Sequence, residues 1–117
     1  MNKFNLIVAL TYSALIIYLG LSESDSISFS NFRINDKLAH LLSYLFFYFL
    51  WQKIFVSWFN DKALTNLFVF ALTFGILIEL GQKYLTLTRS SEFLDVVFNL
   101  IGILLAHIYF NLKKRKI

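Results

Sequence analysis

Four long apolar runs dominate this sequence, and they constrain the fold more than any other feature. The runs cover about residues 4–21, 38–59, 63–80 and 93–112, and the spans that we predict from them cover about residues 4–21, 37–52, 63–82 and 93–112. Each is close to the roughly 20 residues that an α-helix needs to cross about 30 Å of hydrocarbon. The chain contains no proline and four glycines, so few residues would break a long helix. Inside lipid, a helix also satisfies every backbone N–H and C=O group within its own segment.

The composition agrees with a chain that resides in a membrane. Hydrophobic residues make up 58% of the 117 positions and charged residues 15%, unlike the average soluble domain. We therefore predict an all-α fold, a single domain over residues 1–117 that forms an integral membrane four-helix bundle. The first run is longer than the apolar core of about 7–15 residues in a secretory signal peptide, so we interpret it as a retained helix.

Two polar residues and two tryptophans predict where the second membrane segment ends. Gln52 and Lys53 interrupt the second apolar run. We therefore expect its membrane part to end near Trp51, with the remainder lying along the interface. Trp51 and Trp58 would then lie at the level of the lipid headgroups, where tryptophan is enriched.

The positions of lysine and arginine predict the orientation of the helices. With an even number of spans, one side holds seven of the eleven basic residues: Lys3, Lys53, Lys62, Lys113, Lys114, Arg115 and Lys116. The other side holds Arg33, Lys37, Lys83 and Arg89. Because cytoplasmic segments carry the excess of lysine and arginine, we expect both termini in the cytoplasm. The basic residues lie at the ends of apolar runs and form no groove with the phenylalanines, so nucleic acid is not an expected partner.

Polar side chains within or beside the apolar runs are the candidates for function, because an ionisable group at mid-bilayer costs about 2.5–3.5 kcal/mol. They recur at spacings of three or four, so the members of each set share one helix face. The sets are Asp36, His40 and Tyr44 on the second run, Gly75, Glu79 and Gln82 on the third, and Glu92, Asp95, Asn99, Gly102 and Ala106 on the fourth. In the predicted orientation, the polar members lie at the extracytoplasmic ends of three helices.

We therefore predict a polar pocket on the extracytoplasmic side, about two helical turns deep. Such a pocket could receive a polar headgroup while the lipid tails remain in the bilayer. Its candidate residues are Asp36, Lys37, His40, Tyr44, Glu79, Gln82, Arg89, Asp95 and Asn99. Small residues would let neighbouring helices approach closely, and the candidates for this packing are Gly75, Gly102 and Ala106.

The polar residues also have purely structural interpretations. Asp36 can cap the second helix, and Ser91 with Glu92 can cap the fourth. Lys37 and Arg89 can extend their charged ends to the interface. Interhelical hydrogen bonding without further chemistry is the alternative for the imidazole and the two amides, His40, Gln82 and Asn99.

Glu79 and Asp95 require partners at membrane depth. The two carboxylates would repel each other if both were ionised in a poorly solvated site. We expect Asp95 to pair with Arg89, which precedes the fourth apolar run by about one turn, and Lys37 to lie nearer water. A structural ion-pair network is the alternative to a binding site.

Several kinds of chemistry are not expected from this sequence. The chain has no cysteine, which excludes disulfides, thiolate metal sites and thiol nucleophiles. His40 and His107 lie at opposite ends of their spans and cannot share a metal, so we expect no metal and no cofactor. The sequence has no glycine-rich phosphate loop, no HExxH motif and no nucleophile elbow.

The polar sets together carry a family resemblance. The pattern Asp36-Lys37-x-x-His40-x-x-x-Tyr44, then Glu79-x-x-Gln82, then Arg89 followed six residues later by Asp95-x-x-x-Asn99-x-x-Gly102, resembles the VanZ-like family. That family is named after a protein linked to teicoplanin resistance. The resemblance covers about residues 36–106, and it departs at Ala106, where members often carry a second glycine. It implies a bacterial, multi-pass protein of the cytoplasmic membrane, with low-level glycopeptide resistance in the founding case and no defined biochemical activity.

Three hypotheses of function follow. The first is a protein whose partners are membrane lipids or a lipid-linked cell-wall intermediate, bound by the headgroup through Lys37, Arg89 and the polar residues around them. The second is a membrane enzyme in which His40 acts as acid or base, oriented by Asp36 or Asp95 and assisted by Glu79. The third is a structural bundle whose polar network only determines helix register. The pattern makes no prediction of the oligomeric state.

Overall fold

The protein is all-helical throughout the part of the chain that the structure describes. This computed structural model describes residues 3–21, 33–85 and 93–115, and the side chains of all of these except 33–36 and 115. The elements are α1 (Lys3–Leu21), α2 (Arg33–Phe59), the short 3-10 helix η2 (Asn60–Lys62), α3 (Ala63–Leu85) and α4 (Phe93–Arg115). The predicted all-α class is therefore confirmed.

Three helical stretches are long and apolar enough, by length and composition, to cross a membrane. They are Lys3–Leu21, Lys37–Leu85 and Phe93–Lys114. The middle stretch has 49 residues because η2 joins α2 to α3 without a break. These stretches indicate an integral membrane protein.

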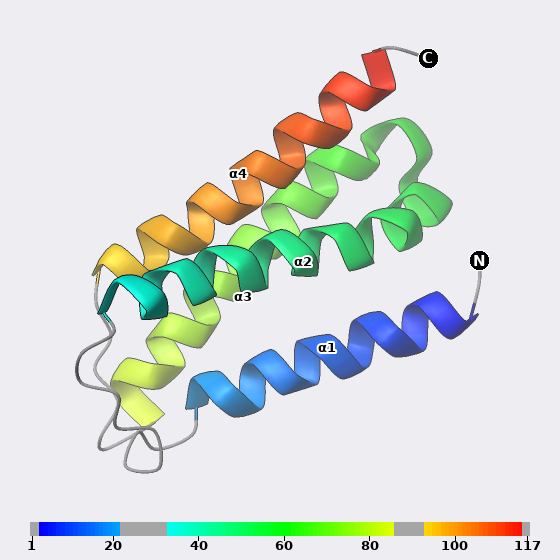
Figure 1. Ribbon diagram of the computed structural model, residues 1–117. Helices are drawn as coiled ribbons and strands as arrows, with labels where there is room; N and C mark the ends of the chain where they lie inside the picture. The colour runs from blue at the N-terminus through cyan, green and yellow to red at the C-terminus, as the bar shows by residue number, and fades with distance from the viewer. Residues whose placement is uncertain (1–2, 22–32, 86–92, 116–117) are drawn as a thin grey trace.

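The chain reverses direction at η2. Asn60 has a φ of 53° there, in the left-handed region that asparagine tolerates better than most residues. Figure 1 shows α3 running back along α2 after this turn. The start of α1, η2 and the end of α4 therefore lie at one end of the bundle, here called the turn end. The start of α2, the end of α3 and the start of α4 lie at the opposite end, here called the polar end.

Aromatic side chains of α2 fill the centre of the bundle, since α2 contacts each of the other three α-helices. Phe47 and Tyr48 are fully buried. The Phe47 ring stacks on Phe70 and Phe74 of α3, with centroids 5.7 and 4.6 Å away. Tyr48 stacks on Phe110 of α4 at 6.0 Å. Each such ring pair contributes about 0.5–1.5 kcal/mol beyond the burial of its area.

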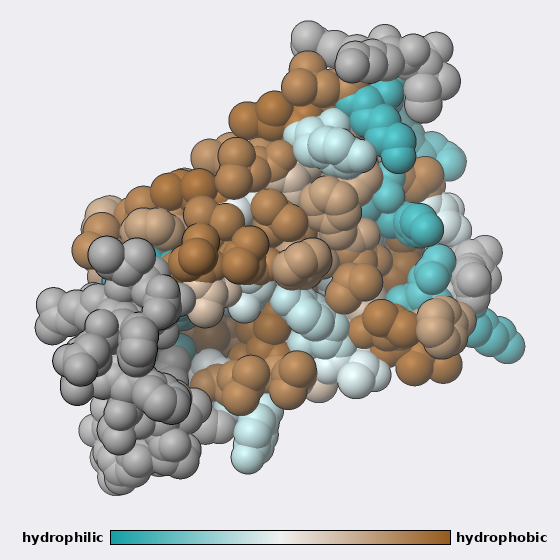
Figure 2. Space-filling model, in the orientation of Figure 1, coloured by the Kyte–Doolittle hydropathy of each residue, from teal (hydrophilic) through white to brown (hydrophobic). Residues whose placement is uncertain are grey.

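The outside of the described helices is also apolar. Large side chains such as Phe4, Leu77 and Leu105 are exposed. Figure 2 shows hydrophobic residues across the middle of the visible face and hydrophilic residues gathered toward the turn end. Soluble monomers rarely expose continuous apolar surface of this kind, so the outer face fits contact with lipid.

The second helix continues past the predicted end of its membrane segment. Its backbone shows no break at Gln52 and Lys53, and α2 continues unbroken to Phe59. Trp51 is buried between α2 and α1 with 6% of its surface exposed, and its predicted depth at the headgroup level stays a prediction. Its indole N–H donates to Ser13 Oγ at 2.9 Å. Burial of this tryptophan is possible because the indole finds its hydrogen-bond partner on α1.

Candidate functional site

Six polar side chains of α2, α3 and α4 lie in the interior at the polar end of the bundle. Each of three helices supplies a pair: Lys37 and His40 from α2, Glu79 and Gln82 from α3, and Asp95 and Asn99 from α4. Five of them are buried, and His40 is half-buried. Glu79 and Asp95 expose only 4% and 5% of their surfaces. Helical spacing explains the convergence, because residues three or four apart on each helix share the face turned inward.

The central contact of this cluster is an ion pair between α2 and α4. Lys37 Nζ donates to Asp95 Oδ1, and the two side chains expose 11% and 7% of their surfaces. Lys37 was expected nearer water, with Arg89 as the partner of Asp95. Lys37 is instead 8% exposed and neutralises Asp95 itself. Its position three residues before His40 places it on the inward face of α2, and this spacing was the signal available in the sequence.

His40 is oriented by Asn99. The imidazole Nδ1 lies 3.0 Å from Asn99 Oδ1. Because an amide oxygen only accepts, Nδ1 carries the proton and donates. The other nitrogen, Nε2, then faces the carboxylates, 3.9 Å from Asp95 Oδ1. The expected orienting partner was Asp36 or Asp95. His40 donates this hydrogen bond to Asn99, and the side chain of Asp36 lies outside the described part of the structure.

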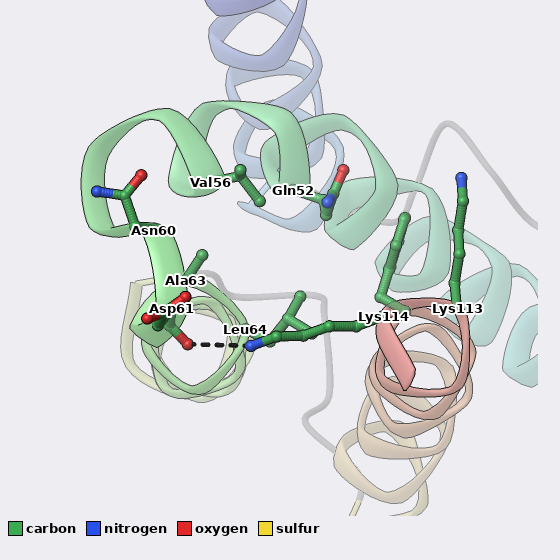
Figure 3. A pocket seen from close by; sticks show the side chains of 9 residues that line it. Gln52, Val56, Asn60, Asp61, Ala63, Leu64, Lys113 and Lys114 are labelled. Atoms are coloured by element: carbon green, nitrogen blue, oxygen red, sulfur yellow. Dashed lines mark hydrogen bonds between the residues drawn. The ribbon is translucent and has the colours of Figure 1, made fainter. Parts of the chain in front are cut away.

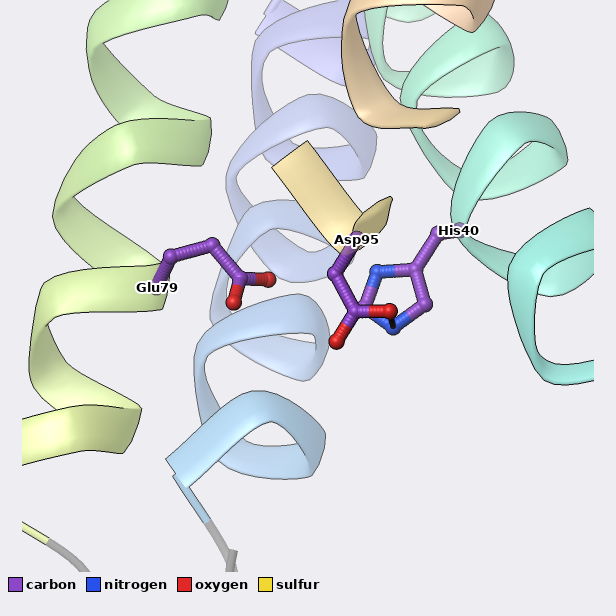
Figure 4. Close-up of side chains that lie close together, drawn as sticks. All are labelled: His40, Glu79 and Asp95. Atoms are coloured by element: carbon purple, nitrogen blue, oxygen red, sulfur yellow. Dashed lines mark ion pairs between the residues drawn. The ribbon is translucent and has the colours of Figure 1, made fainter. Parts of the chain in front are cut away.

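The imidazole and the two carboxylates form a compact group. His40, Glu79 and Asp95 each offer a ligand atom, and these atoms lie within 4.8 Å of one another. Figure 4 shows the Glu79 carboxylate directed toward Asp95 and His40. A transition-metal ion could use such ligands. A metal bound here would share the Asp95 carboxylate with the Lys37 ammonium, and the two cations would repel each other.

Two buried polar atoms beside this group lack hydrogen-bond partners among the described residues. They are Tyr44 Oη and Asn99 Nδ2. A Cβ atom added at Gly75 would lie 3.6 Å from Tyr44 Cζ and 3.8 Å from Asn99 Nδ2. Both groups therefore border the same point on α3, and the missing side chain of Gly75 leaves room for them.

The small residues predicted at helix contacts lie in the interior. A Cβ atom at Gly102 would come within 2.2 Å of the backbone oxygen of Leu41. Gly102 thus allows α4 to touch the backbone of α2, next to the polar group. Ala106, one turn further along α4, is 1% exposed. At Gly75 the nearest neighbour of an added Cβ is the Tyr44 ring, at 3.2 Å.

A second polar contact nearer the turn end was missed by the sequence analysis. Tyr48 Oη lies 2.7 Å from His107 Nδ1 and 3.3 Å from the backbone oxygen of Leu64. One assignment of the hydrogen atoms satisfies both contacts. In it, His107 Nδ1–H donates to Tyr48 Oη, and the Tyr48 hydroxyl donates to the backbone oxygen of Leu64. Tyr48 continues the spacing of four from His40 and Tyr44, and this was the signal that could have identified it.

Two of the predicted pocket residues cannot be placed. Arg89 and the side chain of Asp36 lie outside the described residues. The same holds for Ser91 and Glu92, the predicted cap of the fourth helix. The expected pair of Arg89 with Asp95 therefore stays a prediction, whereas the pair of Lys37 with Asp95 is observed.

Comparisons of the chain with protein families, with curated proteins and with solved structures found no match. The resemblance to the VanZ-like family therefore stays a prediction from the motifs in the sequence.

Proposed function

We propose that this chain is a four-span protein of a bacterial cytoplasmic membrane whose polar end binds the headgroup of a lipid or of another cell-envelope amphiphile. One observation carries the proposal: Tyr44 Oη and Asn99 Nδ2 are buried beside Gly75 and lack partners among the described residues. A buried polar atom without a hydrogen bond costs about 1–3 kcal/mol. A ligand that bonds to both atoms recovers that cost.

The lengths and directions of the helices support four crossings. α2 and α3 have 27 and 23 residues, and each exceeds the roughly 20 that a span requires. They run in opposite directions on either side of η2, so they act as two spans. The turn end carries Lys3, Lys53, Lys62, Lys113 and Lys114. By the excess of basic residues the turn end is cytoplasmic and the polar end extracytoplasmic.

The polar end has the chemistry to hold an amphiphile. Carboxylates accept hydrogen bonds from hydroxyl or ammonium groups, and the Asn99 amide and Tyr44 hydroxyl donate to phosphate or carbonyl oxygens. The exposed apolar side chains of the same helices face the lipid tails. The motifs that resemble the VanZ-like family support the same proposal and extend it to a role in resistance to glycopeptides such as teicoplanin.

The test compares the wild type with a variant that lacks the Tyr44 hydroxyl. The full chain is purified in a mild detergent, and bound amphiphiles are extracted and identified by mass spectrometry. The wild type should retain one class of polar amphiphile at a constant molar ratio of amphiphile to protein. Tyr44→Phe keeps the ring that packs on Phe47 and Phe74, and it should reduce that ratio about fivefold to tenfold, because one buried hydrogen bond is lost.

A matched control separates binding from general damage. Tyr84→Phe makes the same change on α3 at a side chain that is 71% exposed, and it should leave the ratio unchanged. Equal retention by Tyr44→Phe and Tyr84→Phe would show that the polar end does not bind the amphiphile. The thermal unfolding of both variants should stay close to that of the wild type.

A membrane enzyme is the second candidate, and the orientation of His40 favours it. Asn99 holds Nδ1, and this leaves Nε2, 3.9 Å from Asp95 Oδ1, as the nitrogen that could exchange a proton with a ligand. Turnover of the co-purified amphiphile by the wild type, lost in His40→Gln without loss of bound amphiphile, would establish this activity. Unfolding of His40→Gln in detergent would instead favour a structural network that determines helix register.

A further inference from the structure

A separate cavity lies at the turn end, far along the bundle from the polar group. It has a volume of about 390 Å³ and lies between the end of α2, η2, the start of α3 and the end of α4. Figure 3 shows its lining, and none of these residues belongs to the polar end. This volume falls within the range of about 300–1,000 Å³ that is typical of ligand pockets.

The cavity has an apolar floor and a polar, basic rim. Leu64 and Phe110 are buried and form the floor with Ala63. Val56 on α2 extends the apolar wall and is 40% exposed. The rim carries polar and charged side chains from three elements: Gln52, Asn60, Asp61, Lys113 and Lys114.

The charges on the rim select for an anion. Two lysines line the cavity against one aspartate. Lys114 Nζ reaches across the mouth and donates to the backbone oxygen of Asp61 at 3.4 Å, an exposed and long hydrogen bond (Figure 3). This bond leaves the positive charge of Lys114 without neutralisation, because the acceptor is an uncharged carbonyl oxygen. Neither lysine forms an ion pair with a carboxylate among the described residues, so an anionic group can bind both ammonium groups there without first breaking such a pair.

We infer that this cavity binds the phosphate headgroup of an anionic lipid. The two lysines meet the phosphate, the amides of Gln52 and Asn60 meet its ester and hydroxyl oxygens, and the acyl chains follow the apolar outside next to Val56. A soluble anion would use only the rim, whereas a lipid uses the rim and the apolar surface together. The inference does not depend on the function proposed for the polar end.

The test measures binding of two lipids to the full chain in detergent by native mass spectrometry. Phosphatidylglycerol is the anionic probe, and phosphatidylcholine is the zwitterionic one. The wild type should bind phosphatidylglycerol more tightly. Each basic residue at a membrane surface accounts for about a fivefold change in affinity, so Lys113→Gln with Lys114→Gln should weaken this binding by tenfold or more.

A control variant removes two lysines from the turn end, as the rim variant does, but from positions outside the cavity. Lys53→Gln with Lys62→Gln alters two exposed lysines that do not line the cavity, and it should leave the preference for phosphatidylglycerol intact. Val56→Trp fills the cavity without changing the charge. It should weaken the binding of phosphatidylglycerol by a factor similar to that of the rim variant, Lys113→Gln with Lys114→Gln. Equal losses in the rim and control variants would overturn the inference, because they would indicate general attraction between charges.

Inorganic phosphate distinguishes a lipid from a soluble anion. We expect phosphate at millimolar concentration to leave bound phosphatidylglycerol in place, since phosphate lacks the apolar part. Displacement of the lipid by phosphate alone would overturn the assignment to a lipid. Circular dichroism of each variant verifies that the helices remain folded.

Discussion

The ammonium group of Lys37 lies against the carboxylate of Asp95 and joins the start of α2 to the start of α4, 58 positions apart in the chain. Both side chains are buried, and the second carboxylate, Glu79, approaches from α3. Lys37 thus neutralises Asp95 in the interior of the polar end. The imidazole of His40 is the next group able to carry a positive charge there.

We predict that Lys37→Gln lowers the stability of the protein substantially. The substitution leaves Asp95 buried without its lysine, and such a broken pair costs about 3–5 kcal/mol. Thermal unfolding in detergent measures the loss. Lys83→Gln removes an exposed lysine from the same end and should change the free energy of unfolding by less than about 0.5 kcal/mol.

Removing both partners should recover most of this loss. The double variant Lys37→Met with Asp95→Leu removes both charges of the pair together, so neither is left buried without its partner, and it is expected to unfold near the wild-type temperature. A double variant as unstable as Lys37→Gln would contradict a pair that acts as one unit. It would mean that Lys37 or Asp95 is needed for another contact.

We predict that Gly102→Ala destabilises the bundle by about 1–3 kcal/mol, because the added methyl group collides with the Leu41 backbone. Gly81→Ala is the matched control. Its added methyl group meets Leu21 Cδ2, the end of a flexible side chain that can move away. Chemical or thermal unfolding of the two variants compares the costs. A smaller loss for Gly102→Ala than for Gly81→Ala would show that α2 and α4 do not pack this closely.

We predict that Tyr48→Phe costs about 1–3 kcal/mol, since it removes the hydroxyl between His107 and the Leu64 backbone. The ring stacking on Phe110 is retained. Tyr109→Phe makes the same change at a half-exposed ring and should have little effect. Unfolding temperatures that do not differ between these variants would indicate that the Tyr48 hydroxyl contributes no net stability.

We predict that both termini face the cytoplasm, from the lysines at the turn end. A reporter that is active only on the extracytoplasmic side of the membrane should be inactive when fused at Ile117. It should be active when inserted within residues 24–30. Activity of the fusion at Ile117 would reverse the orientation and move the polar end to the cytoplasmic side.

The amino-acid sequence by itself determined the helical class and the composition of the polar faces. Apolar runs of spanning length have few folded solutions in lipid, and a spacing of three or four assigns residues to one face whatever the partner helix is. Glu79, Asp95 and Asn99 were therefore predicted as interior residues, and the structure buries them. Gly102 was likewise predicted at a helix contact, and it lies against Leu41.

Only the tertiary structure decided which side chains meet across helices. Spacing says nothing about the depth and rotation of one helix against another, so Lys37 could not be distinguished from Arg89 as the partner of Asp95. The burial of Trp51 depends on Ser13 of α1, and the contact of Tyr48 with His107 depends on the register of α2 with α4. The basic cavity depends on the reversal at Asn60, which brings the start of α3 beside the end of α4. These contacts join residues distant in the chain, and packing of the whole bundle determines them.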